Sequence, residues 1–142
     1  DSKDDLVAAM VADQLDRQRA HFNELEPGIA GIERFVREYL SADHRDGRGD
    51  GCPSSALIDQ IGRQSDATRR AYTEGMTAII DDLAATLGMK GSAARRQLFS
   101  AFALMVGALQ LSRAVDDPSL SADILDRAAI DALTLIRAVG PG

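Results

Sequence analysis

The chain has 142 residues and a formal net charge of -6 at pH 7, with 45% hydrophobic and 4% aromatic residues. This length fits one domain with a sizeable core, and the apolar fraction excludes an intrinsically disordered chain. The single cysteine excludes a disulfide framework. The sequence contains no run of about 18 apolar residues, so it predicts no membrane-spanning helix. Its net negative charge gives it no general attraction for nucleic acid. We therefore expect one soluble, cytoplasmic domain over 1–142, with no membrane partner. Because the first residue is aspartate, we also expect other sequence to precede it in the full protein.

The first half of the chain carries two clear helix signals. Ser2 and Asp5 have the spacing of a capping box. A stripe at helical spacing follows, and it contains two glutamines: Val7, Met10, Val11, Gln14, Leu15, Gln18 and Phe22. A second helix is predicted with Pro27 in its first turn and with one apolar face of Ile29, Ile32, Val36, Tyr39 and Leu40. Residues 41–52 are rich in glycine and charge, which predicts an exposed loop.

The second half predicts four more helices. Pro53 opens a short helix that Gly62 ends, and Ser65 or Asp66 caps a longer one that ends at a left-handed Gly88. A helix from Ser92 to about Val115 is apolar on every side over 98–111, so we expect part of its cover to come from a second subunit. A last helix, capped by Ser119 or Ser121, completes an all-α fold of about six helices.

The sequence offers little for catalysis or metal binding. His21 and His44 belong to no HExxH or ExxH motif, and no GxSxG elbow, phosphate-binding loop or dinucleotide motif occurs. The paired aspartates fall at helix ends, and the glycines around His44 and Cys52 leave possible ligands unorganised. We predict no metal, no cofactor and no enzymatic activity. Cys52, at a predicted helix N-terminus where the dipole favours a thiolate, is a candidate redox or electrophile sensor, although a packing role explains it more simply.

Bulky, adaptable side chains recur on the faces expected to point inward. Thioethers and aromatic rings suit an irregular cavity for flat apolar molecules, although core packing explains any one of them. As a set they predict a ligand cavity lined by Met10, Phe35, Tyr39, Leu57, Tyr72, Met76, Phe102 and Met105.

Three passages carry a resemblance to a known family. They are the Gly-Cys-Pro turn at 51–53 with the amphipathic helix after it, the end of the penultimate helix at 113–118 with the sequence RAVDDP, and the start DSKDDL at 1–6. Together they resemble the C-terminal regulatory domain of TetR-family transcriptional regulators, over essentially the whole chain. The RAVDDP passage is the most specific of the three.

The resemblance implies a ligand-binding and dimerisation domain whose N-terminal helix-turn-helix domain is absent from this chain. Residues 1–22 would form the helix that joins the two domains, with Lys3 touching a DNA phosphate, and operator DNA would bind only through the missing domain. The last two helices would pair with those of a second copy as a four-helix bundle. Its interface would contain Val106, Gly107, Gln110, Ala128, Ala132 and Ile136.

The implied mechanism is a shift between two conformations. In the family arrangement, the two DNA-reading domains of a dimer lie about one DNA turn apart, roughly 34–36 Å. A small, largely apolar effector held beneath the first helix would tilt it and release the operator. We therefore expect a homodimeric repressor. The alternatives are a thiol sensor acting through Cys52, a dimerisation module without a ligand, and a helical-bundle enzyme, which would need a polar catalytic pair in the pocket.

Overall fold

A computed structural model describes residues 2–47 and 52–138, and within them it contains seven helices and no strand. The prediction of an all-α fold is confirmed. The helices are α1 (Lys3–Asn23), α2 (Ile29–Tyr39), α3 (Ala42–Asp46), α4 (Pro53–Gly62), α5 (Asp66–Thr86), α6 (Gly91–Ala114) and α7 (Pro118–Arg137). None of these helices is long and apolar enough to cross a membrane.

Most helix ends lie where local chemistry places them. The capping box at the start of α1 is present in both directions: Asp5 N–H donates to the Ser2 hydroxyl, and the Asp5 carboxylate accepts from Ser2 N–H. Pro53 occupies the first turn of α4, and Ser65 caps α5. Gly88 follows the end of α5 at φ 65°, a conformation that favours glycine.

Three local predictions are wrong. Pro27 lies outside α2, which starts at Ile29 after Gly28. The N-cap of α7 is Asp117, and not Ser119 or Ser121 as predicted. The Asp117 carboxylate accepts hydrogen bonds from two backbone N–H groups. The segment predicted as a loop contains α3, a five-residue helix whose N-cap is Ser41. Such a short helix is not stable by itself, so only tertiary contacts can hold it.

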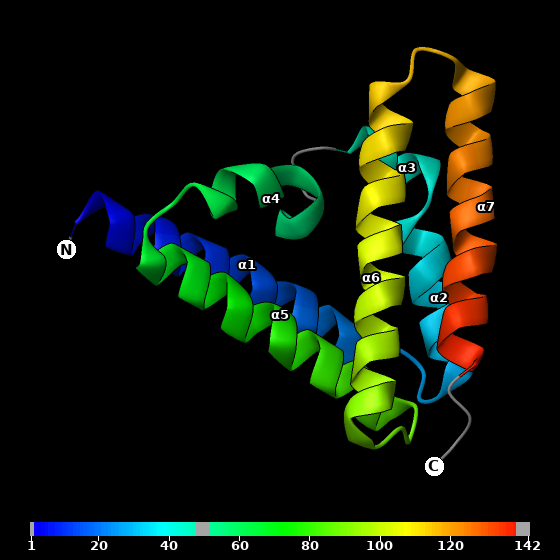
Figure 1. Ribbon diagram of the computed structural model, residues 1–142, viewed down its shortest axis with the longest axis horizontal. Coiled ribbons are helices and arrows are strands. Elements are labelled where there is room, and N and C mark those ends of the chain that lie inside the picture. The colour runs from blue at the N-terminus through cyan, green and yellow to red at the C-terminus, as the bar shows by residue number, and fades with distance from the viewer. Residues whose placement is uncertain (1, 48–51, 139–142) are drawn as a thin grey trace.

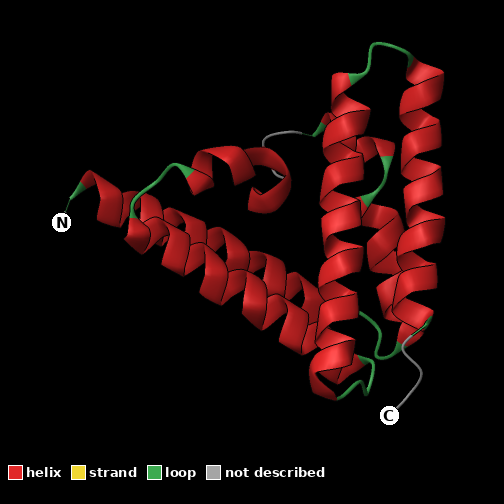
Figure 2. Ribbon diagram, viewed as in Figure 1, coloured by secondary structure: helices red, strands yellow, loops and turns green. Residues whose placement is uncertain are grey.

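Two helix pairs dominate the arrangement (Figures 1 and 2). α6 and α7 lie antiparallel, and α1 and α5 lie side by side at a steep angle to them, with the N-terminus far from the α6–α7 pair. α2 packs against α7, while α3 and α4 pack against α6. The N-terminal half of α1 thus projects away from the body formed by the other pair.

The contact between α1 and α5 is close because of one glycine. A Cβ atom on Gly75 would lie 2.7 Å from a methyl carbon of Leu15, which is itself fully buried. Further along, the Arg19 guanidinium donates to the Asp82 carboxylate, with an Nε–Oδ2 distance of 2.5 Å. Packing at the glycine and the ion pair fix α1 on α5 along its C-terminal half.

Candidate functional site

A cavity of about 450 Å³ lies between the C-terminal half of α1 and the segments α2, α3 and the start of α4. This size is within the range of small-molecule pockets. Its lining consists of Gln14, Arg17, Gln18, His21, Phe35, Glu38, Tyr39, His44, Cys52 and Pro53. We divide these residues by exposure. The buried ones, Phe35, Tyr39, Cys52 and Pro53, form the inner wall, and the exposed ones, Gln14, Arg17, His21 and Glu38, form the mouth.

Aromatic rings gather at the inner wall. Phe35 and Tyr39, one helical turn apart on α2, have ring centroids 5.6 Å apart. Phe22 of α1 covers Phe35 at 4.1 Å, and Phe102 of α6 lies 6.4 Å from Tyr39. The His44 ring meets Tyr39 edge-on at 4.7 Å. The cavity therefore has a wall of flat, well-supported rings on the side of α2.

Two buried polar atoms lie at this cavity without a hydrogen-bond partner among the described residues. They are the hydroxyl oxygen of Tyr39, a residue with 3% of its surface exposed, and the amide oxygen of Gln18. Burial, and after it the nearby Cys52 thiol, holds the pKa of Tyr39 well above its ordinary value, so the hydroxyl keeps its proton. The Ser55 hydroxyl is also a neighbour and acts in the opposite direction, but neither Cys52 nor Ser55 makes a well-formed hydrogen bond to Tyr39. A buried polar atom without a partner loses its hydration and gains nothing in return. A bound ligand or an ordered water molecule would supply the missing partner.

The two tyrosines of the chain make a matched pair for testing this cost. The Tyr72 hydroxyl lies 2.7 Å from that of Ser54, which is fully buried. Tyr39→Phe removes an unpartnered hydroxyl and is expected to leave the free energy of unfolding unchanged or to raise it by about 1 kcal/mol. Tyr72→Phe leaves the buried Ser54 hydroxyl without this hydrogen-bond partner, so it is expected to lower the free energy of unfolding by about 1 kcal/mol. Urea unfolding followed by circular dichroism measures both. Equal losses in the two variants would mean that Tyr39 has a partner.

His44 adds a neutral polar group between the inner wall and the mouth. Its Nδ1 lies 2.7 Å from the backbone oxygen of Tyr39. Burial lowers the pKa of His44 from its ordinary value, and the Arg113 guanidinium acts in the same direction, so the ring is neutral at pH 7. Because Nδ1 faces a carbonyl, it carries the proton, and Nε2 is then a hydrogen-bond acceptor.

The charged groups at the mouth are already paired. Glu38 accepts from the Arg34 guanidinium at 2.8 Å and lies 3.7 Å from His21, and the bond to Arg34 is the main reason that the pKa of Glu38 is lowered. Arg17 pairs with Asp13 at 2.9 Å. These exposed pairs contribute little to stability, but they leave both signs of charge beside the opening.

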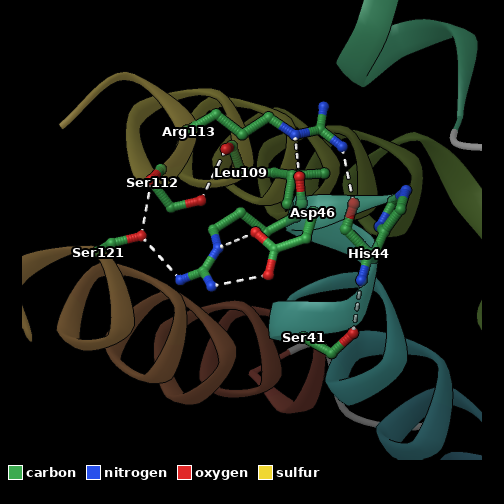
Figure 3. Close-up of polar contacts among 8 residues, drawn as sticks. Ser41, His44, Asp46, Leu109, Ser112, Arg113 and Ser121 are labelled. Atoms are coloured by element: carbon green, nitrogen blue, oxygen red, sulfur yellow. Dashed lines mark hydrogen bonds and ion pairs between the residues drawn. The ribbon is translucent and has the colours of Figure 1, made fainter. Parts of the chain in front are cut away.

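Arg113 of α6 ties the α3 segment and α4 to the rest of the fold. Its guanidinium donates to the backbone oxygens of His44 and Arg45, at 2.8 and 2.9 Å (Figure 3). It also donates to the backbone oxygen of Ser55 in α4, at 3.2 Å. The first two are C-terminal carbonyls of α3, which have no partner inside so short a helix. Arg45 in turn bonds Asp46 and the Ser121 hydroxyl, and Ser121 donates to the backbone oxygen of Ser112. One arginine thus holds the His44 side of the cavity against α6.

A second feature is an apolar groove on the outer face of α6 and α7, which we call the outer groove. It has a volume of about 490 Å³ and is lined by Ala103, Leu104, Gly107, Ala108, Leu111, Leu120, Asp123, Ile124, Arg127, Ala128 and Asp131. Leu111 is 59% exposed and Leu120 46% exposed. Arg127 donates to Asp131 within the groove. Large side chains exposed together in this way are typical of an interaction surface.

The structure separates the predicted ligand residues. Phe35 and Tyr39 line the cavity. Phe102 and Met105 lie with Phe35 around a void of about 20 Å³, which is too small for an organic ligand. Leu57, Tyr72 and Met76 are half-buried and pack against the core, away from the cavity lining. Met10 is 57% exposed, so the expectation that it faces inward is wrong.

The predicted interface residues are also divided. Val106, Ala132 and Ile136 are buried inside the subunit, so they present little surface to a second copy. Gln110 is exposed but donates its amide to the Ser55 backbone oxygen, toward α4. Gly107 and Ala128 line the outer groove. When a helix is apolar on every side, its sequence does not indicate which face points outward. Successive residues lie about 100° apart around the helix axis, so an error of one residue assigns a different face.

Sequence reasoning missed the polar half of the cavity. Gln14 and Gln18 stand within the stripe of α1, and a polar amide at such a position was the available signal. Cys52, the sensor candidate, lies at the inner wall as the N-cap of α4. Lys3 is exposed in the first turn of α1, where its contact with DNA stays a prediction. Within the described ranges, no three histidine, cysteine, aspartate or glutamate side chains come together to hold a metal.

Comparison with known proteins adds no identification, since no protein-family model and no curated protein matches the chain. The resemblance to TetR-family regulators therefore rests on the sequence passages alone.

Proposed function

We propose that this chain is a small-molecule-binding and dimerisation domain of a transcriptional regulator of the TetR type. The effector binds in the 450 Å³ cavity beneath α1, and two copies associate through the outer groove. The observation that carries the proposal is the cavity itself, with its aromatic inner wall and the unpartnered hydroxyl of Tyr39.

The position of the cavity supports a regulatory role. One side of its lining comes from the C-terminal half of α1, while the N-terminal half of that helix projects away from α6 and α7 (Figure 1). A ligand pressed against Gln14 and Gln18 would tilt α1 about its packed end, and the movement grows toward Lys3. A DNA-reading domain joined there would follow the tilt. The ligand shifts this equilibrium only by the difference in its affinity for the two orientations.

The outer groove supports a homodimer. Its floor is apolar and its edge carries both signs of charge, with Arg127 between Asp123 and Asp131. A two-fold copy placed on the groove could bring Arg127 of each subunit toward an aspartate of the other. α6 would then receive, on its open side, the cover that its own chain does not give to Leu104 and Leu111.

The effector role is tested by ligand binding. A library of small aromatic and heteroaromatic compounds is screened by thermal unfolding, and hits are located by amide chemical shifts. A compound at 100 times its Kd is expected to add about 2.7 kcal/mol to the free energy of unfolding. Its shifts should centre on Gln18, Phe35 and Tyr39. If no compound binds, or if every hit shifts only residues of the outer groove, the proposal fails. The thiol-sensor alternative predicts a different result: an oxidant or electrophile, and no reversibly bound compound, would shift the unfolding temperature, and Cys52→Ser would remove that shift.

The tilt of α1 is tested by spin labels. Ala9, exposed on the projecting half of α1, is replaced by a labelled cysteine in the Cys52→Ser background. In the dimer, a cavity ligand is expected to shift the distance distribution between the two labels. A ligand that binds the cavity and leaves this distribution unchanged would contradict the proposed mechanism.

A further inference from the structure

We infer that the cavity selects an uncharged, planar aromatic molecule bearing a group that both donates and accepts hydrogen bonds, as a phenolic hydroxyl does. This inference rests on the proposed function, because it names the chemical class of ligand for the same cavity. Three properties of the lining carry it: the rings, the unpartnered polar atoms and the distribution of charge.

The rings set the shape and character of the ligand. Phe35 and Tyr39 form a continuous aromatic surface at the inner wall, supported from behind by Phe22 and Phe102. Aromatic rings pack best on other rings, in offset or edge-on geometry. Rings held this firmly cannot open to admit a bulky aliphatic group without disturbing the core. A flat aromatic body is therefore favoured.

The polar atoms set the functional group. The Tyr39 hydroxyl keeps its proton and needs an acceptor, while the Gln18 amide oxygen needs a donor. His44, through Nε2, offers a further acceptor. A ligand hydroxyl can accept from Tyr39 and donate to an acceptor on this wall, and one such group removes the cost of leaving these atoms unpaired. An ether in the same place has no proton to donate.

The charges exclude an ionised group at the inner wall. Its four residues, Phe35, Tyr39, Cys52 and Pro53, include no cation, and the two half-buried lining residues, Gln18 and His44, are neutral. A carboxylate placed there would be desolvated without a counterion. At the mouth, Arg17 and Glu38 are each paired already, with Asp13 and Arg34. The ligand is thus expected to be neutral where it meets the rings.

The test compares three probes with the same ring system. They are 2-naphthol, its methyl ether 2-methoxynaphthalene, and 2-naphthoate, titrated calorimetrically into the whole chain at pH 7. We expect 2-naphthol to bind at least tenfold more tightly than the ether, which lacks the donor, and than the carboxylate. Equal affinities for the three probes, or tightest binding of 2-naphthoate, would overturn the inference.

Variants then assign the preference to its atoms. Tyr39→Phe and Gln18→Leu should each reduce the affinity for 2-naphthol about tenfold while changing that for the ether little. The matched controls Tyr72→Phe and Gln60→Leu alter the same kinds of group at residues outside the cavity lining and should keep the wild-type preference. Circular dichroism confirms that each variant is folded. A preference that persists in both cavity variants would overturn the inference.

The two proposals fail in different ways. If 2-naphthol does not bind but other compounds shift the amide signals of Phe35 and Tyr39, the ligand class is wrong and the effector-binding function stands. If no compound of any class reaches the cavity, both are wrong. In that case ordered water satisfies Tyr39 and Gln18.

Discussion

Replacing Gly107 with glutamate is expected to raise the dissociation constant of the dimer at least 100-fold. Gly107 lines the outer groove, and a Cβ atom added there would meet no atom within 4 Å in the single subunit. The subunit should therefore tolerate the change, and a helix interior even gains roughly half a kcal/mol when glycine is replaced by a better helix former. In a dimer across this groove, however, two carboxylates would be buried in an apolar contact without partners, at a cost of several kcal/mol.

Sedimentation velocity over a concentration series measures this effect. Ala9→Glu adds the same charge on the exposed side of α1 and should sediment as the wild type does. Circular dichroism should show both variants folded. A Gly107→Glu protein that remains dimeric would place the interface elsewhere, and a monomeric wild type would remove the dimer from the proposal.

Arg113→Ala is expected to lower the free energy of unfolding by about 3 kcal/mol. The guanidinium makes three hydrogen bonds to backbone oxygens, of His44, Arg45 and Ser55, and because Arg113 is only half-buried we take about 1 kcal/mol for each. Removing it also leaves the C-terminal carbonyls of α3 without a partner. Since α3 has only five residues, we expect it to lose its helical structure in the variant.

Two further variants show whether the effect comes from geometry or from charge. Arg113→Lys keeps the charge but cannot reach three carbonyls at once, so it should lose about half as much stability. Arg63→Ala removes an exposed arginine paired with Asp59 and should change stability by less than about 0.5 kcal/mol. Urea unfolding gives all three values. A loss below about 1 kcal/mol for Arg113→Ala would mean that other contacts hold α3.

Local signals in the sequence identified six of the seven helices. The capping box of Ser2 and Asp5, the proline that opens α4 and the left-handed Gly88 each act within one helical turn, so the printed residues are enough to predict them. α3 could not be predicted in this way. Its residues give no apolar stripe, and the group that satisfies its last carbonyls, Arg113, is distant in the sequence.

The candidate site was predicted only in part. Phe35 and Tyr39 were found because large aromatic residues at helical spacing usually face inward, and the structure places both at the inner wall. Gln14 and Gln18 were missed because a polar residue in a helical stripe can face either water or a cavity. Only the packing of α1 on α5, which turns Gln14 and Gln18 toward the cavity, decides between the two. Met10 was misplaced for the complementary reason, since the packed face of α1 is narrower than its apolar stripe.

The sequence by itself therefore determined the six longer helices and their apolar character, because hydrogen bonds and caps within a helix depend on neighbouring residues. The tertiary structure decided which face of each helix is covered. On α6, both Val106 and Gly107 suit an apolar surface, yet Val106 is buried inside the subunit and Gly107 lines the outer groove. The choice follows from how whole helices cross and pack, and that depends on residues from every part of the chain.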